Sequence, residues 1–425
     1  KRMQKGRQQG CRVGNTNMLM ALIPLFDDKM AVRAYSIFSQ KDNVFLNPSL
    51  LGTGKNDGAA VVEGLELIER VGIETLSEDR EIFVPVSNIS IFSDVESQCS
   101  APHNRIVFLI DHTVPPVDVY VNRLRELKQK GYKLAVRKLS VADYESWREI
   151  FKLTDYMFLN NRKVAIDKAK TYFKKLYPQI RLCAGGIDSM YTYEYLRDVE
   201  KFELYEGEFY RVPVTRGKHE VAPLKVNYIE LLNVVNNENF ELTAAADVIG
   251  RDTALTISLL KMVNRMTVNS GITTIRHAAA MLGQKELKRW INTAVVNQLY
   301  ADKPSEITRL SLIRAKFAEN LAPLFQLQNK TEELFLMGLF SVLDVILELP
   351  MKQALDMVMV TGEVSSALIE DTGKLAPVYD MMKHYEMADW QEVSRLLLLA
   401  NMDVKQVSGA YLKALSWYKN LMTEK

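Results

Sequence analysis

The chain has 425 residues, of which 48% are hydrophobic and 25% are charged. This length favours two domains over one, and the apolar fraction is too high for a disordered protein. The formal net charge is only +2. The composition therefore gives no sign of an acidic partner, and nucleic acid is not expected as a ligand.

Cysteine and histidine are few and dispersed. The three cysteines, Cys11, Cys99 and Cys183, form no CxxC pair, which is typical of a protein from the reducing cytoplasm. The five histidines form no HxH, HExxH or His-Asp motif, so no zinc site is expected. No apolar run reaches the roughly 20 residues of a membrane helix. We therefore expect a cytoplasmic protein without a membrane span.

The first 17 residues carry five cations and no anion, and the apolar run LMALIPLF follows them. This order resembles a signal peptide, but the run is short, Asp27 and Asp28 end it, and no small-x-small cleavage site follows. We therefore expect residues 1–17 to be a basic leader that is disordered or foreign to the native chain. A basic arm that binds anions is the alternative.

Residues 18–213 alternate between short apolar runs and amphipathic helices. The runs are rich in β-branched and aromatic residues, and strands that alternate with helices predict a largely parallel sheet. An α/β barrel is the preferred architecture, and a doubly wound sheet is the alternative. The predicted strands are MALIPLF, VRAYSIF, EIFVPVS, RIVFLID, KLAVRKL, YMFLN, RLCAGGI and ELYEGEFY.

The pattern changes near residue 224. From there the predicted elements are all helices with an apolar period near 3.6, such as TALTISLLKMVNRM and KELKRWINTAVVNQLY. Prolines, a glycine and mixed charge mark the junction as a linker. The sequence thus predicts a barrel domain over 18–213, a linker over 214–224 and an all-α domain over 225–425.

The first domain resembles the EAL domain, the barrel phosphodiesterase of cyclic di-GMP signalling. IPLFDDKMAVRAYSIF is similar to the family's opening strands, and LRELKQKGYKLAVRKL to the stretch that normally ends in an aspartate pair. TDYMFLN resembles the strand that normally ends in Lys-x-Asp, and LYEGEFYRVP the closing segment. The resemblance implies a TIM-like barrel in which oxygen ligands hold two divalent metal ions.

Few of the residues that the family uses are present. Its substrate-binding, metal-binding and catalytic positions fall, in chain order, on Leu22-Ile23, Ser36, Pro85 (or Ser87 or Asn88 in a shifted register), Phe108, Arg137-Lys138, Phe158, Asn160 and Gly185. Asp111, Asp188 and Glu206 remain acidic but do not form a ligand set. A cation about 4 Å from another unit positive charge costs about 4 kcal/mol at an effective dielectric constant of about 20. The sequence therefore predicts a degenerate EAL domain without a metal ion.

Two interpretations of Arg137 and Lys138 stay open. They either form salt bridges at the barrel mouth, with Asp111, Asp188 or Glu206, or bind a phosphate or an acidic partner surface. They are accordingly the candidate ligand-binding residues, and we predict no catalytic residue, metal ligand or cofactor.

The second domain resembles the HDOD domain, a helical relative of the HD hydrolases. ADVIGRDTALTISLLKMVNRM and ITTIRHAAAMLGQKELKRWI carry this resemblance. The position of the hydrolases' metal-binding His-Asp doublet falls on Leu343-Asp344, so no metal is expected here either. An EAL domain followed by an HDOD domain is a known bacterial arrangement, which supports both assignments.

The sequence therefore predicts a regulatory bacterial signal-transduction protein that is not an enzyme. It would act through protein–protein interactions with other signalling proteins, bound by the HDOD domain. The alternative is a non-hydrolysing receptor for cyclic di-GMP or another nucleotide, although Leu22-Ile23 speaks against a cyclic dinucleotide. An active phosphodiesterase is the third interpretation. The partner, the pathway and the oligomeric state cannot be read from the sequence.

Aromatic side chains gather near the C-terminus. Tyr, Trp and Met are enriched at the cores of protein interfaces. Two interpretations are open: the residues pack the last helices and are buried, or they form an exposed docking face. The residues concerned are Tyr385, Trp390, Trp417 and Tyr418.

Overall fold

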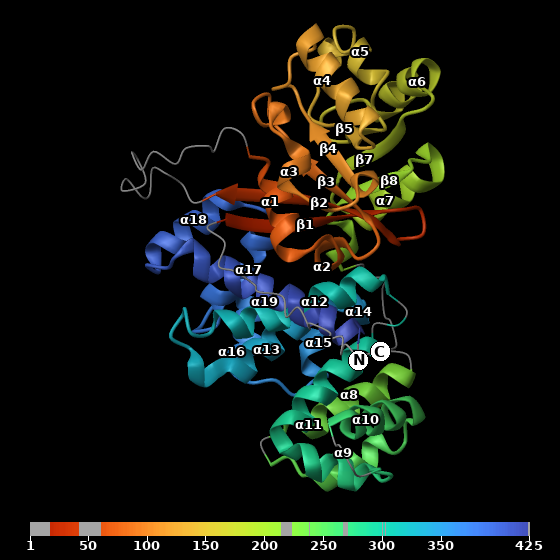
Figure 1. Cartoon of the computed structure of the whole chain (residues 1–425). Helices are drawn as coiled ribbons and strands as arrows, with labels where there is room; N and C mark the ends of the chain where they lie inside the picture. The colour runs from red at the N-terminus through yellow and green to blue at the C-terminus, as the bar shows by residue number, and fades with distance from the viewer. Residues whose placement is uncertain are drawn as a thin grey trace, which may run out of the picture. The chain divides into compact units, whose positions relative to one another are not determined.

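The computed structural model describes residues 18–41, 61–213, 223–237, 239–266, 271–299, 301 and 303–423 (Figure 1). The predicted leader at 1–17 and most of the predicted linker lie outside the described residues. The chain divides into two compact units. The first comprises Lys1–Tyr210, Pro323–Leu327 and Met381–Lys425, and the second comprises Arg211–Ala322 and Gln328–Asp380.

A closed barrel of eight strands forms the centre of the first unit, with the strands in chain order around it. β1 runs antiparallel to both of its neighbours, and the other neighbouring pairs are parallel. The barrel is therefore confirmed and the doubly wound alternative is excluded. The strands are β1 (Met18–Phe26), β2 (Val32–Lys41), β3 (Glu81–Pro85), β4 (Ile106–Ile110), β5 (Lys133–Val136), β6 (Tyr156–Asn160), β7 (Arg181–Ile187) and β8 (Leu204–Gly207).

Helices surround the barrel between the parallel strands. In α4 the buried side chains Val121, Leu124 and Leu127 recur every third residue, which places them on one face. The chain then leaves the helix through Gly131, whose φ of 93° favours glycine. The helices are α1 (Glu63–Val71), α2 (Ile73–Ser77), α3 (Val95–Gln98), α4 (Asp118–Gln129), α5 (Arg148–Phe151), α6 (Ile166–Leu176) and α7 (Met190–Tyr195), with shorter turns at Ser90–Phe92, His103–Arg105, Val141–Asp143, Leu196–Glu200 and Phe209–Arg211.

Side chains at alternate strand positions fill the barrel, because successive side chains of a strand point to opposite faces. Ser36, Arg137 and Glu206 each lie two positions beyond a residue of this interior cluster, so they face the interior near its C-terminal end. The cluster consists of Leu25, Ala34, Phe83, Val107, Leu109, Ala135, Tyr156, Phe158, Cys183 and Leu204.

All described residues of the second unit lie in helices, turns or loops, which confirms the predicted all-α fold. α11 joins two predicted helices and is interrupted at Gly283, which has a φ of 74°. None of the described helices is long and apolar enough to cross a membrane. From residue 223 on, the helices are α8 (Pro223–Asn236), α9 (Leu242–Ile249), α10 (Thr253–Met266), α11 (Ile275–Leu299), α12 (Ser305–Leu321), η8 (Gln328–Lys330), α13 (Thr331–Phe340), α14 (Leu343–Leu347), α15 (Met351–Asp356), α16 (Gly362–Glu370), α17 (Ala376–Glu386), α18 (Trp390–Leu399) and α19 (Val404–Thr423).

The C-terminal segment belongs with the barrel, which corrects the assignment of 225–425 to a single helical domain. α19 packs along β1 (Figure 1). Ser408 Oγ donates a hydrogen bond to the Met18 carbonyl at 2.7 Å, and the Met20 amide donates to the Tyr385 hydroxyl at 3.4 Å. Nearly every side chain of β1 is buried. The last helices therefore cover a strand that would otherwise expose an apolar face.

The aromatic side chains near the C-terminus serve this packing. Tyr385 is fully buried, and its ring lies 5.5 Å from Trp390 and 4.8 Å from Tyr411 between centroids. Trp390, Trp417 and Tyr418 are half-buried. None of the four predicted candidates is exposed, which favours the packing interpretation over an exposed docking face.

Candidate functional site

The C-terminal ends of the strands form the mouth of the barrel, which is where barrel enzymes carry their chemistry. Three polar side chains reach this end of the barrel next to two aromatic rings. We call these five residues the mouth cluster: Ser36 and Phe38 from β2, Arg137 directly after β5, Phe158 from β6 and Glu206 from β8.

Arg137 is held by both rings and by the carboxylate. Its guanidinium carbon lies 5.0 Å from the ring centroid of Phe38 and 5.7 Å from that of Phe158. Its Nη2 lies 3.5 Å from Oε1 of Glu206, and the two side chains are only 18% and 14% exposed. A cation–π contact contributes about 0.5–2 kcal/mol. The predicted salt bridge at the mouth is thus present, with Glu206 as the partner.

Several polar atoms of the mouth cluster are buried without a hydrogen bond to any described residue. They are Nε and Nη1 of Arg137, Oε2 of Glu206 and Oγ of Ser36. Buried polar atoms are nearly always bonded, and leaving one unbonded costs about 1–3 kcal/mol. The cluster therefore offers donors, an acceptor and a hydroxyl that can act as either. Buried donors and acceptors without hydrogen-bond partners at a barrel mouth indicate a candidate ligand-binding site.

The other residues predicted to act at the mouth lie apart from this cluster. Lys138 is exposed, has a φ of 54° and forms no ion pair within the described ranges, so it does not act together with Arg137. Asp188 pairs with Arg162 at 2.9 Å on the surface, and Asp111 accepts hydrogen bonds within its own turn. Of the two candidate ligand-binding residues, only Arg137 lies in the cluster.

Phe108 does not face the mouth, so the sequence alignment that placed a ligand position there is wrong by one residue. Its neighbours Val107 and Leu109 both belong to the barrel interior. Phe108 packs instead against Tyr132, with ring centroids 4.8 Å apart. A shift of one residue moves a side chain to the other face of a strand, and the interior positions on either side of Phe108 are Val107 and Leu109.

The described residues do not fit a pair of divalent metal ions. Such ions need several oxygen ligands. Within the described ranges no group of three His, Cys, Asp or Glu residues could hold a metal ion. Glu206 is paired with Arg137, and Gly185 beside it has no side chain. The absence of a metal ion stays a prediction.

In the helical part of the chain, the position of the HD doublet is occupied by the start of α14. Burial raises the pKa of the Asp344 carboxyl, while a hydrogen bond from the Val345 amide and the charge of Arg314 act in the opposite direction. The carboxyl is thus held by its own helix terminus. This arrangement agrees with a structural role for Asp344.

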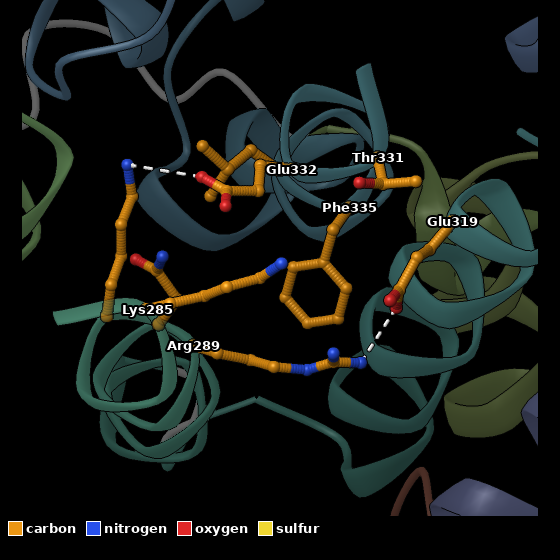
Figure 2. Close-up of a pocket in the computed structure, with 9 residues that line it drawn as sticks. Lys285, Arg289, Glu319, Thr331, Glu332 and Phe335 are labelled. Atoms are coloured by element: carbon orange, nitrogen blue, oxygen red, sulfur yellow. Dashed lines mark hydrogen bonds and ion pairs between the residues drawn. The ribbon is translucent and has the colours of Figure 1, made fainter. Parts of the chain in front are cut away.

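A pocket lies between α11, α12 and α13 of the helical unit (Figure 2). Figure 2 shows Arg289 beside the Phe335 ring. Arg289 donates a hydrogen bond to Glu319 at 2.8 Å, and Lys288 lies 3.9 Å from Glu332. None of the unbonded buried atoms found in the described part of the chain belongs to this pocket. It is therefore the weaker candidate site. Its lining consists of Lys285, Lys288, Arg289, Asn292, Glu319, Thr331, Glu332, Phe335 and Leu336.

Comparison with known families identifies the helical part. The HDOD domain family matches residues 221–351. Together with the closed barrel that precedes it, this match confirms the predicted order of a barrel domain followed by an HDOD domain.

Two relatives are similar over most of the chain. The cyclic di-GMP phosphodiesterase CdgJ of Vibrio cholerae is 27% identical over 325 residues, which cover 75% of this chain and 74% of the relative. The uncharacterised protein YuxH of Bacillus subtilis is 26% identical over 420 residues, which cover 96% of this chain and 100% of the relative.

Solved structures of EAL domains are also similar. An EAL domain protein from Listeria monocytogenes is 15% identical, with a TM-score of 0.36, over 45% of this chain and 87% of that chain. The EAL domain of DcpA from Mycobacterium smegmatis is 13% identical, with a TM-score of 0.33, over 45% of this chain and 90% of that chain.

The relatives correct one prediction. The chain was expected not to be an enzyme, but CdgJ is named a phosphodiesterase. The expectation rested on a position-by-position alignment, and the structure shows this alignment to be shifted at Phe108. We also predicted that a cyclic dinucleotide is not a ligand, and the name of this relative disagrees with that prediction. The interaction with protein partners stays a prediction.

Proposed function

We propose that this protein acts in cyclic di-GMP signalling and that the mouth of its barrel binds the nucleotide. The similarity to CdgJ over three quarters of the chain supports the first part. The second part rests on the unbonded polar atoms of Ser36, Arg137 and Glu206. A ligand that forms hydrogen bonds with these atoms offsets the free-energy cost of burying them, because a hydrogen bond to a charged group contributes about 1.5–3 kcal/mol.

The mouth cluster is also preorganised for ligand binding. Phe38 and Phe158 hold the Arg137 guanidinium in place, so little side-chain entropy remains to be lost on binding. An arginine presents its donors in a planar fork that matches planar or bidentate acceptors. The site therefore favours a nucleotide over an apolar ligand.

The test is titration calorimetry of the full-length protein with cyclic di-GMP in EDTA, and a separate hydrolysis assay with magnesium or manganese. Saturable binding with a stoichiometry near one supports the proposal, and turnover supports it as well. Cyclic di-AMP serves as the control ligand. A protein that neither binds nor hydrolyses cyclic di-GMP would overturn the proposal.

A second proposal concerns the output of the signal. The helical unit carries three exposed methionines, Met266, Met281 and Met359, with exposures of 68%, 50% and 51%. Methionine adapts to varied partners and is enriched at interfaces, which supports a partner-binding role for this unit. We expect a specific partner to be captured by the wild type and lost when all three are changed to Gln. Met387→Gln in the first unit is the matched control, and capture that all these variants share would contradict the proposal.

A further inference from the structure

We infer that Arg137 and Glu206 together bind the edge of a guanine base, and that the phosphates of the ligand lie elsewhere. This inference rests on the proposed function, because it names the part of cyclic di-GMP that enters the mouth cluster. Its starting point is that unbonded donors and an unbonded acceptor occur side by side.

The charge of the mouth cluster argues against a phosphate. Arg137 and Glu206 form an ion pair, so the two side chains together carry no net charge. A phosphate offers only acceptors. It would bond to Arg137, leave Oε2 of Glu206 unbonded, and bring a second negative charge next to that carboxylate. The cluster therefore selects a neutral group that donates as well as accepts.

A guanine base has this combination. Its O6 and N7 atoms accept hydrogen bonds, and an arginine that donates to both is the commonest specific contact to guanine in nucleic-acid recognition. Its N1 and N2 groups donate, and enzymes that bind a single base read this edge directly. We assign O6 or N7 to the free donors of Arg137 and N1–H or N2–H to Oε2 of Glu206. The hydroxyl of Ser36 can serve either kind of group.

The same arrangement disfavours adenine. Adenine donates at N6, where guanine accepts at O6, and accepts at N1, where guanine donates. In the pose assigned to guanine, adenine therefore sets an acceptor against the carboxylate of Glu206. A site built to bond a particular group rejects the analogue without it by large factors, up to about 10⁴–10⁵. Adenine can offer its N6–H₂ donor to Glu206 only in a different pose, so we expect cyclic di-GMP to bind at least about tenfold more tightly than cyclic di-AMP.

The deciding variant is Glu206→Gln, because the two possible ligand groups predict opposite signs. If guanine donates to Glu206, replacing the carboxylate with an amide weakens cyclic di-GMP binding by about tenfold or more. If a phosphate occupies the cluster, removing the negative charge strengthens binding. Glu203→Gln is the matched control, since Glu203 precedes the same strand and pairs with Lys174 at the opposite end. We expect it to leave the affinity unchanged.

The experiment is calorimetry of wild type, Glu206→Gln and Glu203→Gln with both cyclic dinucleotides in EDTA, with thermal unfolding as the check on folding. Equal or tighter binding of cyclic di-GMP by Glu206→Gln would overturn the inference and leave the proposed function standing. The selectivity of the wild type is a second readout that needs no variant, and a ratio near one would overturn the inference too. A wild type that neither binds nor hydrolyses cyclic di-GMP removes the proposed function, and the inference with it.

Discussion

The charged side chains at the two ends of the barrel differ in how completely they are hydrogen-bonded. At the N-terminal end, the Tyr156 hydroxyl donates to Glu81 at 2.6 Å and accepts from Arg181 at 2.9 Å. Glu81 also pairs with Lys133. At the C-terminal end, Arg137 and its partner retain several buried atoms without hydrogen bonds to described residues.

This difference separates stability from function. In barrel proteins the N-terminal end commonly serves stability, and the C-terminal end carries the site. A fully bonded network around a buried hydroxyl stabilises the fold, whereas buried polar atoms without hydrogen bonds lower stability and are retained for a reason such as ligand binding. Removing one member of the N-terminal network should therefore lower stability, whereas replacing both members of the mouth pair with apolar residues should not.

The largest effect is expected at the N-terminal end. Glu81→Met removes the acceptor of the Tyr156 hydroxyl and the partner of Lys133, so we expect the free energy of unfolding to fall by about 2–3 kcal/mol. Urea unfolding measures it. Glu78→Met, which breaks an exposed pair with Arg80, is the control and should change it by less than about 1 kcal/mol. Equal effects of the two variants would remove the basis of the comparison.

The opposite sign is expected at the mouth. Replacing both members of a buried ion pair with hydrophobic residues is often neutral or stabilising. We expect the double variant Arg137→Met, Glu206→Met to gain about 1 kcal/mol in urea unfolding, since it also removes the unbonded polar atoms. A loss as large as that of Glu81→Met would show that the mouth serves stability instead.

The pH dependence of stability sharpens the difference further. Burial, and then the hydrogen bond to Glu81, raise the pKa of the Tyr156 hydroxyl. The unfolded phenol titrates near pH 10, so this group's contribution is complete below that pH and declines above it by about 1.4 kcal/mol per pH unit. Tyr156→Phe should lose stability less steeply than the wild type between about pH 10 and 11. Parallel curves for the two proteins would contradict the assigned cause.

The smallest effect is expected at Lys138. Because its side chain is exposed and forms no ion pair within the described ranges, Lys138→Ala should change the free energy of unfolding by less than about 0.5 kcal/mol. Its affinity for cyclic di-GMP should stay within about threefold of the wild type, since an exposed charge contributes little to binding. A tenfold weaker affinity would place Lys138 in the site after all.

Much of the fold could be predicted from the sequence, because it follows from local periodicity. All eight strands were predicted from their apolar and β-branched runs, and their alternation with helices predicted the barrel. The assignment of α18 and α19 could not be predicted. An amphipathic period shows that a helix buries one face, but not which surface covers it, and here that surface includes β1.

The site was predictable only in part. Arg137 stood out because a cation occupies the end of a barrel strand. Its partner Glu206 is 69 residues away in the chain, and Ser36 stands out because it is buried and lacks a hydrogen-bond partner among the described residues. Both facts depend on neighbours in space. The placement of a site position on Phe108 was wrong for a different reason, because a shift of one residue decides which face of a strand a side chain occupies.

The most direct test of the account is the affinity of the mouth variant for the nucleotide. Titration calorimetry in EDTA compares the wild type, the double variant Arg137→Met, Glu206→Met, and Lys138→Ala as the control. We expect the double variant to fold at least as stably as the wild type, yet to bind cyclic di-GMP more than about tenfold more weakly. Unchanged affinity in a folded double variant would contradict the claim that the mouth of the barrel is the binding site.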